Sequence, residues 1–215
     1  MITIEQTEWC CRYLTDKLNT LVKSIGPIRI GNKEQFPFGW RKAAKGRTVW
    51  RILEEIINQN LEVLHSDLGF SIVEPSPSEV SVYDTRLQIT NNNIDIYINV
   101  KSALLGGRTN KDDISKAIGL QSFFSEDIRR QLFICTFVVD FNDEMYIDIK
   151  ECFVMPISWL PDIYVNPSNN GNLQSSKYKN IDNAIRRTNQ EFLIELEDEM
   201  EVARQKRINK QKKLS

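Results

Sequence analysis

The sequence predicts an α/β domain in which a mixed central β-sheet carries helices on both faces. Three features predict it. The stretch 80–103 alternates apolar and polar residues on either side of the polar tetrad 90–93, which is typical of a β-hairpin. The run 131–140 is continuously apolar and of strand length, as expected for a strand covered on both faces. Segments with a helical apolar period precede, separate and follow these strands.

The N-terminal third is expected to hold two helices. Residues 4–25 are amphipathic, and Thr3 with Gln6 can form a capping box at their start. A second helical period covers about 48–64, beginning near Thr48. The glycine- and proline-containing segments between and after these helices are expected to be loops: residues 26–46 and 66–78.

The chain after the hairpin is expected to supply the rest of the sheet. Residues 113–125 predict a helix, with Asp112 or Asp113 as its N-cap, that crosses over to strand 131–140. That strand is expected to run parallel to the hairpin strand bearing Lys101. One or two strands, a long polar loop and a terminal helix are expected to follow: residues 145–160, 166–179 and 181 onwards.

A length of 215 residues suits a single domain. Within it we expect an N-terminal helix and loop, a core that holds the functional residues, a polar loop with the C-terminal helix, and a basic tail that frays: residues 1–45, 46–165, 166–200 and 201–215.

Composition excludes several classes of function. Hydrophobic residues make up 41% and charged residues 27%, so a folded core is expected. No apolar window approaches the roughly 18 residues of a membrane span and no signal peptide opens the chain, so we expect a soluble, cytoplasmic protein. His65 is the only histidine, which excludes multi-histidine metal sites. The four cysteines lack paired C-x-x-C spacing and are expected to be buried free thiols. A net charge of −1 argues against indiscriminate coating of nucleic acid.

The hairpin can support phosphodiester hydrolysis. Asn99 and Lys101 share one face of the second strand, and the folded hairpin can bring Asp84 of the first strand close to them. Hydrolysis needs a cation that activates water and neutralises phosphate charge. Magnesium prefers oxygen ligands, and the candidates are Asp84, the side-chain oxygen of Asn99 and the carbonyl of Val100. Lys101 is expected to orient the attacking water or stabilise the transition state.

A further carboxylate is expected from the second helix. At ~100° per residue, Glu54 borders the apolar face of that helix, whereas Glu55 points nearly opposite to it. Glu54 is therefore the preferred fifth member of the site, as a catalytic residue and a metal ligand.

At these residues the chain resembles the PD-(D/E)xK nuclease superfamily, and within it the type II restriction endonucleases. The matching segments cover roughly residues 46–200 and are RILEEII, VYDTRL, INVKSA, GGRTNKDDISKAIGLQSFF with the apolar strand after it, and RRTNQEFL. The resemblance implies a restriction-endonuclease-like core with Asp84, Asn99 and Lys101 as its active site. It also implies Mg²⁺ dependence and cutting of short palindromic double-stranded DNA by a homodimer, in the cytoplasm of a prokaryote.

Two positions depart from the family pattern. Tyr83 precedes Asp84 where proline is usual, and Asn99 replaces an acidic residue. An amide oxygen can bind a metal but carries no charge, so the metal affinity is expected to fall unless Glu54 compensates. Four alternatives stay open: a DNA-binding protein with a degenerate, inactive nuclease site, a DNA repair or junction-resolving nuclease, a protein-interaction domain with no nucleic-acid role, and an ordinary exposed sheet face with a salt-bridged Lys101.

DNA contacts are expected in three places. A basic run that covers the end of loop 26–46 and the start of the second helix can contact phosphates or lie on a solvated surface: Arg41, Lys42, Lys45, Arg47 and Arg51. Loops 106–112 and 166–179 are candidates for base reading, although asparagine and serine are also ordinary turn formers. Their candidate contact residues are Arg108, Asn110, Lys111, Asn169, Asn170, Asn172, Gln174 and Lys177. The aromatic residues of the first loop are expected to pack beneath it rather than to wedge between bases: Phe36, Phe38 and Trp40.

Overall fold

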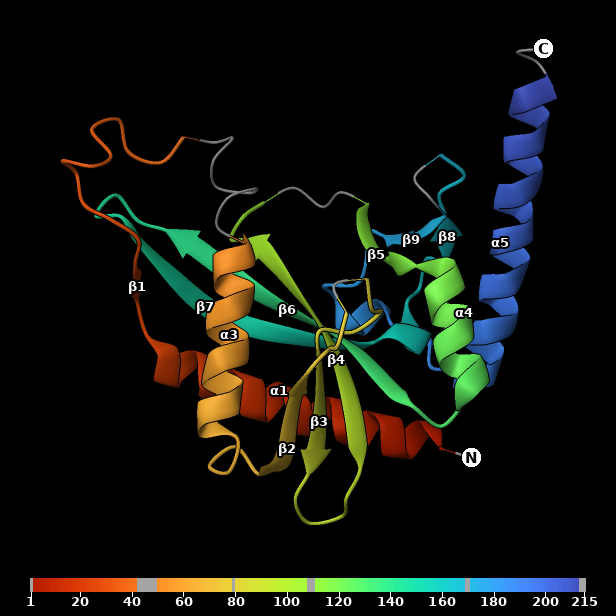
Figure 1. The fold of residues 1–215 in the computed structure, drawn as a ribbon, viewed down its shortest axis with the longest axis horizontal. Helices are drawn as coiled ribbons and strands as arrows, with labels where there is room; N and C mark the ends of the chain where they lie inside the picture. Colours follow the sequence, from red (N-terminus) through yellow and green to blue (C-terminus); the bar gives the residue numbers. More distant parts are fainter. Residues whose placement is uncertain (1, 42–49, 79, 108–110, 169–170, 213–215) are drawn as a thin grey trace.

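The computed structural model describes residues 2–41, 50–78, 80–107, 111–168 and 171–212 (Figure 1). The described helices are α1 (Ile4–Ile25), α3 (Trp50–Leu64), α4 (Ala117–Glu126) and α5 (Asn189–Lys212), with short 3-10 helices η1 (Ile157–Trp159) and η2 (Ile181–Asn183). The strands are β1 (Ile28–Arg29), β2 (Phe70–Pro75), β3 (Thr85–Ile89), β4 (Asp95–Leu104), β5 (Asp112–Lys116), β6 (Gln131–Phe141), β7 (Tyr146–Pro156), β8 (Tyr164–Val165) and β9 (Asn172–Ser175).

The main sheet has six strands in the order β1–β7–β6–β4–β3–β2. β4 and β6 pair in parallel from Ile96 opposite Gln131 to Leu104 opposite Val139, and the other neighbours pair antiparallel. Three further strands form a small separate sheet in the order β5–β9–β8. The mixed sheet and the parallel pairing of the Lys101 strand are therefore confirmed.

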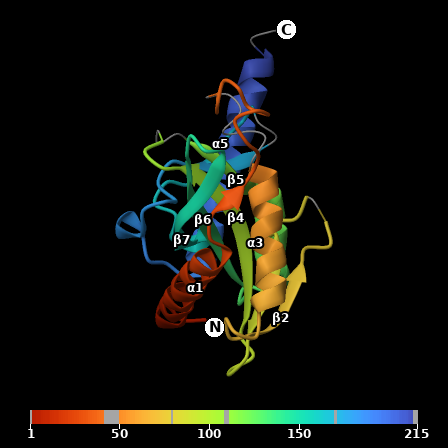
Figure 2. The ribbon, with the colours of Figure 1, turned by 90° about the vertical axis from the view of Figure 1, so that its left-hand side faces the viewer.

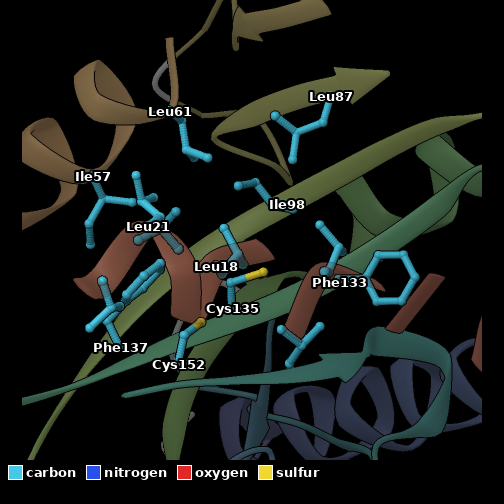
Figure 3. Close-up of a cluster of buried hydrophobic side chains, with 14 of the residues drawn as sticks. Leu18, Leu21, Ile57, Leu61, Leu87, Ile98, Phe133, Cys135, Phe137 and Cys152 are labelled. Atoms are coloured by element: carbon cyan, nitrogen blue, oxygen red, sulfur yellow. The ribbon is translucent and has the colours of Figure 1, made fainter. Parts of the chain in front are cut away.

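One core lies between the main sheet and helices α1 and α3, which Figure 2 shows from the side of β1 and α3. Its β4 members are Ile96, Ile98 and Val100, which alternate with the polar residues of the opposite face, as the hairpin pattern predicts. Figure 3 shows side chains from both helices and the sheet packed together, among them Leu18, Leu21, Ile57, Leu61, Ile98 and Phe133.

A second core covers the other face of the main sheet. There α4 and α5 pack on β6, and the buried members include Leu120, Phe124, Phe192, Leu132 and Ile134. β6 is consequently buried on both faces along nearly its whole length. The continuous apolar run of this strand is explained by that position, and the prediction of helices on both faces is confirmed.

Helix α1 matches its predicted bounds and also protects the outer edge of β7. Both halves of the Thr3–Gln6 capping box are formed. On its outer edge β7 pairs with β1 only at Tyr146 and Ile147, as far as the described residues go. Farther along, Asn19 of α1 donates from Nδ2 to the Cys152 carbonyl at 3.0 Å and accepts from the Cys152 N–H at 2.9 Å. The asparagine amide thus takes the place of a neighbouring strand.

The predicted loop 66–78 is wrong, because Phe70–Pro75 forms β2 at the edge of the main sheet. β2 pairs with β3 from Phe70 opposite Ile89 to Pro75 opposite Thr85. A proline is tolerated at the end of an edge strand, since its missing N–H can face away from the ladder. The predicted loop 26–46 likewise contains the two residues of β1.

The predicted helix 113–125 is wrong over its first turn. Residues Asp112–Lys116 form β5, and α4 begins at Ala117. Neither aspartate caps a helix: Asp112 accepts a hydrogen bond from the Tyr178 hydroxyl at 2.6 Å, and Asp113 accepts from Gln174 at 2.6 Å. The predicted polar loop 166–179 in turn contains β9, the partner of β5.

The terminal helix begins at Asn189 rather than at 181, and it continues to Lys212. Arg187 holds the segment before it: its side chain is 6% exposed and donates to the carbonyls of Ser158 and Leu160 and to Glu195. None of the helices in the described ranges is long and apolar enough to cross a membrane.

Candidate active site

The candidate site lies where the β3–β4 hairpin opens. β3 begins at Thr85, opposite Ile98, whereas β4 continues to Leu104. Asp84 stands just before β3, and its N–H donates to the Ile98 carbonyl at 2.8 Å. Its carboxylate accepts from the Val100 N–H at 2.6 Å, so the side chain takes the hydrogen bond that a longer β3 would otherwise supply. Asp84 is thereby fixed against the backbone of β4.

The second carboxylate comes from α3. Glu54 is half-buried, and its carboxyl group is close enough to that of Asp84 for the two groups to affect each other's pKa. Glu55 is exposed and accepts from Gln59 one helical turn later. The helical phase therefore directs Glu54 and not Glu55 to the hairpin, as the sequence predicts.

The charges of the site act on one another. Burial and the neighbouring Asp84 charge raise the pKa of Glu54 to about 7. Burial also raises the pKa of Asp84, although the Val100 N–H and the Lys101 charge act in the opposite direction. Burial lowers the pKa of Lys101, while the nearby Asp84 and Glu54 favour its charged form. The charge of Lys101 only partly compensates the two neighbouring carboxyl groups. A bound cation would therefore stabilise this site.

Asn99 supplies an oxygen with no protein partner. Its side chain is 6% exposed, and Nδ2 donates to the Val82 carbonyl at 3.0 Å. This bond leaves Oδ1 buried without a hydrogen bond to any described residue. Burying such an oxygen costs free energy, because it loses its hydrogen bonds to water and does not gain a protein donor in exchange. An oxygen of this kind fits a bound cation.

The oxygen donors suit a magnesium ion. No group of three or more histidine, cysteine, aspartate or glutamate side chains in the described ranges is placed to hold a metal. The set here is two carboxylates, one amide oxygen and the Val100 carbonyl. Magnesium is commonly bound by one or two carboxylates and keeps water or phosphate as its other ligands. These residues therefore fit Mg²⁺ better than a metal that needs nitrogen or sulfur.

All five predicted site residues line one cavity of about 370 Å³: Glu54, Asp84, Asn99, Val100 and Lys101. The structure brings them together from α3, the start of β3 and the open part of β4. Their roles in metal binding and catalysis remain predictions. Other residues that the sequence pattern did not indicate line the same cavity, among them Ser81, Asp113, Ser115 and Lys116. The last three belong to β5, which was predicted to be helical, so their side-chain directions could not be inferred.

The two loops predicted to read bases meet in the small sheet. β5 begins at Asp112, the last residue of the first loop, and pairs with β9 of the second. Gln174 is engaged within the sheet, since it donates to Asp113 and accepts from Asn166 at 3.2 Å. Asn172 lines the cavity of the candidate site, and its Oδ1 is buried without a hydrogen bond to a described residue. Asn172 is therefore placed beside the catalytic candidates rather than out on a base-reading loop.

The other predicted DNA contacts are partly described. Lys111 lies over the Tyr164 ring at 4.1 Å, Arg41 lies over Phe38 at 5.3 Å, and Lys177 is exposed. Phe36 packs on Trp40 and Trp40 packs on Phe141, in agreement with the predicted packing beneath the loop. The prediction is wrong for Phe38, which is 79% exposed. The remaining predicted contacts lie outside the described residues: Lys42, Lys45, Arg47, Arg108, Asn110, Asn169 and Asn170.

Without divalent cation, the free energy of unfolding is expected to fall as the pH rises from about 5 to 8. The pKa of Glu54 is raised from 4.5 to about 7 in the folded chain, so the folded state binds more protons than the unfolded state in this interval. The stability associated with the protonated carboxyl is complete below pH 4.5 and is lost as the pH passes 7. We expect a loss of about 1–2 kcal/mol, because solvent screens a half-buried carboxyl.

Urea unfolding in EDTA at several pH values measures this fall, and Glu54→Gln is expected to remove most of it. Glu55→Gln is the matched control, because the neighbouring exposed carboxylate lies outside the cavity. Saturating Mg²⁺ is expected to flatten the wild-type profile. An equal fall in the wild type and in Glu54→Gln would contradict the assignment of the raised pKa to Glu54.

The fold and the cavity define an α/β protein with a mixed central sheet and a carboxylate–lysine site at the open end of a hairpin. No protein-family model matches the chain, and neither does any curated protein. Among solved structures, the chain is similar to the NlaIV restriction endonuclease with 13% identity and a TM-score of 0.39. The similarity covers 63% of this chain and 53% of that enzyme, so the chain spans about half the length of its structural relative. This likeness is too distant to carry a function, which must come from the site.

Proposed function

We propose that the protein is a Mg²⁺-dependent endonuclease that hydrolyses phosphodiester bonds of double-stranded DNA at a short specific site. One observation carries the proposal. One cavity is lined by two carboxylates, a lysine and an asparagine whose buried amide oxygen accepts no hydrogen bond from a described residue. One of the carboxylates is hydrogen-bonded to the backbone of the strand that carries the lysine. Oxygen ligands for a hard cation beside a cationic side chain suit the hydrolysis of an anionic ester.

Each residue has a distinct part in this proposal. Asp84, the Asn99 side-chain oxygen, the Val100 carbonyl and Glu54 hold the cation. When bound, Mg²⁺ supplies a positive charge that lowers the pKa of a coordinated water and polarises the phosphoryl oxygen. Lys101 orients the attacking water through Nζ and stabilises the negative charge that develops on the phosphate. The Val100 N–H fixes the Asp84 carboxylate, so this ligand needs little reorganisation during the reaction.

The substrate would extend from this cavity towards the small sheet. β5 and β9 place Lys116 and Asn172 on the cavity wall, and Lys111 directly precedes β5 in the loop 106–112. These side chains suit phosphate and base contacts. We further propose that two copies of the chain act on a palindromic site, because a two-fold dimer presents the same surface to each half of such a site.

Digestion of a DNA of known sequence tests the function directly. The wild-type chain is expected to give discrete fragments with Mg²⁺ and none with EDTA, and sequencing of the fragment ends gives the recognition site and the cleavage stagger. Smeared products would contradict sequence specificity. Intact DNA at all Mg²⁺ concentrations, in the presence of binding, would support the second candidate function.

The second candidate is a DNA-binding protein without catalysis, favoured by the neutral side chain of Asn99 at a position where a carboxylate is expected. Asn99→Asp separates the two functions. The carboxylate of this variant could no longer donate to the Val82 carbonyl, and we expect a loss of stability of about 1–3 kcal/mol without cation. Under the proposed function the wild type cleaves DNA and Asn99→Asp cleaves no faster.

The measurements are cleavage rate and thermal unfolding, each with and without Mg²⁺. Asn92→Asp, in the exposed turn between β3 and β4, introduces the same charge away from the site and is expected to change neither. Cleavage by Asn99→Asp alone would show that the natural chain is the inactive, DNA-binding form.

A further inference from the structure

A second cavity adjoins the candidate active site. It has a volume of about 310 Å³ and lies between the start of the hairpin and α4. Val80 and Ser81 line both cavities, so the two are contiguous. We call this second space the aromatic cavity, because the side chains of Tyr83, Tyr97 and Phe123 line it.

The three rings form one cluster. The centroids of Tyr83 and Tyr97 are 4.9 Å apart and their planes meet at 67°. Phe123 lies 5.1 Å from Tyr97 and 6.0 Å from Tyr83. Phe123 is 6% exposed, whereas both tyrosines are half-buried and so keep part of their surface open. The cavity therefore offers aromatic surface that the fold has not covered.

The edge of the aromatic cavity is polar. Arg130 lies with its guanidinium 4.8 Å from the centre of the Phe123 ring and donates to Glu126 at 2.7 Å and to the Phe123 carbonyl at 3.1 Å. Ser122 and Glu126 are exposed on α4 at the same cavity. A ligand with flat apolar faces and a hydrogen-bonding edge matches this wall better than a purely apolar one does.

The aromatic residues are close in the chain to the catalytic candidates, both just before β3 and within β4. Tyr83 directly precedes Asp84 in the chain. Tyr97 lies two residues before Asn99 on the same face of β4, a rise of about 7 Å along the strand. A group bound against Tyr97 is thus within one nucleotide of a phosphate held at Asn99 and Asp84.

We propose that the aromatic cavity receives one nucleobase of the cleaved strand, turned out of the duplex, next to the phosphate at the candidate active site. This inference rests on the proposed function and adds the conformation of the bound DNA, in which one base has left the duplex. A base has two flat faces to stack on the tyrosine rings and an edge to bond with Arg130, Glu126 or Ser122. Extrusion is required because a paired base inside the duplex cannot reach a protein cavity.

The test is the affinity of Tyr97→Ala for duplexes that carry the mapped cleavage site, measured by fluorescence anisotropy in EDTA so that the DNA stays intact. We expect a loss of about 5- to 150-fold, as for a removed base-stacking ring. Two further duplexes carry an abasic residue immediately 5′ or 3′ of the scissile phosphate. On one of them the effect of Tyr97→Ala should vanish, because the base that the ring would stack on is absent.

Ser122→Trp fills the aromatic cavity from an exposed position on α4 and so avoids any loss of core packing. It is expected to weaken binding of the intact duplex and to spare the same abasic duplex. Tyr146→Ala removes a half-buried tyrosine of β7 outside both cavities and controls for nonspecific effects. Tyr97→Phe keeps the ring and should restore most of the affinity lost in Tyr97→Ala.

Different results would contradict base binding in the aromatic cavity and the proposed nuclease function. Equal losses for Tyr97→Ala on the intact and on both abasic duplexes, or no effect of Ser122→Trp, would overturn the base-binding inference while site-specific cleavage by the wild type still stood. Absence of both DNA cleavage and DNA binding by the wild type would overturn the proposed function, and this inference with it.

Discussion

Replacing Lys101 by alanine is expected to lower Mg²⁺-dependent DNA cleavage by at least about 10²- to 10³-fold, the cost of removing one preorganised stabilising group from an active site. The DNA affinity should stay nearly unchanged, because one partly buried ammonium contributes little beside the contacts along the duplex. The loss of cleavage is expected because Lys101 lies on the wall of the cavity, where Asp84 and Glu54 favour its charged form. Single-turnover cleavage and gel-shift assays measure the two quantities.

Lys150→Ala is the matched control. Lys150 is a half-exposed lysine of β7 that pairs with Asp148 at 3.5 Å and does not line the cavity. Its loss should leave cleavage intact. Because removal of Lys101 also leaves two carboxyl groups without their nearest cation, thermal unfolding must show that the variant is folded. Cleavage by a folded Lys101→Ala variant at the wild-type rate would end the nuclease proposal.

Asp84→Asn is expected to lower cleavage by at least as much as Lys101→Ala, without lowering the stability of the fold. The amide oxygen can still accept from the Val100 N–H, which now donates at 2.6 Å, so the shape of the hairpin should survive. The negative charge is lost, and with it a ligand that binds and orients the cation, so cleavage should fall by at least about 10³-fold. Without cation the variant should be as stable as the wild type or more stable by about 1 kcal/mol, since a buried carboxylate beside Glu54 has been neutralised.

Chemical unfolding in EDTA, repeated with Mg²⁺, measures the stability of both proteins and its response to the cation. The wild type should gain stability from Mg²⁺, and Asp84→Asn should gain little. Asp148→Asn, which neutralises a carboxylate of β7 paired with Lys150, is the control and should retain both cleavage and the Mg²⁺ response. A cation response in Asp84→Asn equal to that of the wild type would remove Asp84 from the set of metal ligands.

The parts of the site predicted from the sequence are those in which local periodicity decides the direction of a side chain. Alternation along β4 placed Asn99 and Lys101 on one face and the isoleucines on the other, and the burial of Ile96 and Ile98 agrees. The helical phase of α3 separated Glu54 from Glu55. The parallel partner of β4 followed from the helix expected between the two strands, which makes the connection a crossover.

The parts that the sequence did not predict depend on partners far away in the chain. β5 resembles the first turn of a helix because two aspartates precede an apolar residue, and only its pairing with β9, about 60 residues later, makes it a strand. Asn172 consequently faces a cavity that no local pattern could indicate. The aromatic cavity depends on Tyr83, Tyr97 and Phe123 meeting from three separate segments.

The amide of Asn19 has a consequence for how copies of this chain can assemble. An unpaired strand edge is the usual place where a second molecule continues a sheet. At the outer edge of β7 the hydrogen-bonding groups of Cys152 are already occupied by this side chain, and the Val154 carbonyl accepts from Cys11 of the same helix. A dimer built by joining two main sheets through β7 would have to displace α1. This edge is therefore closed to a second copy of the chain as long as α1 stays in place, and sheet-to-sheet pairing is left to the opposite edge at β2.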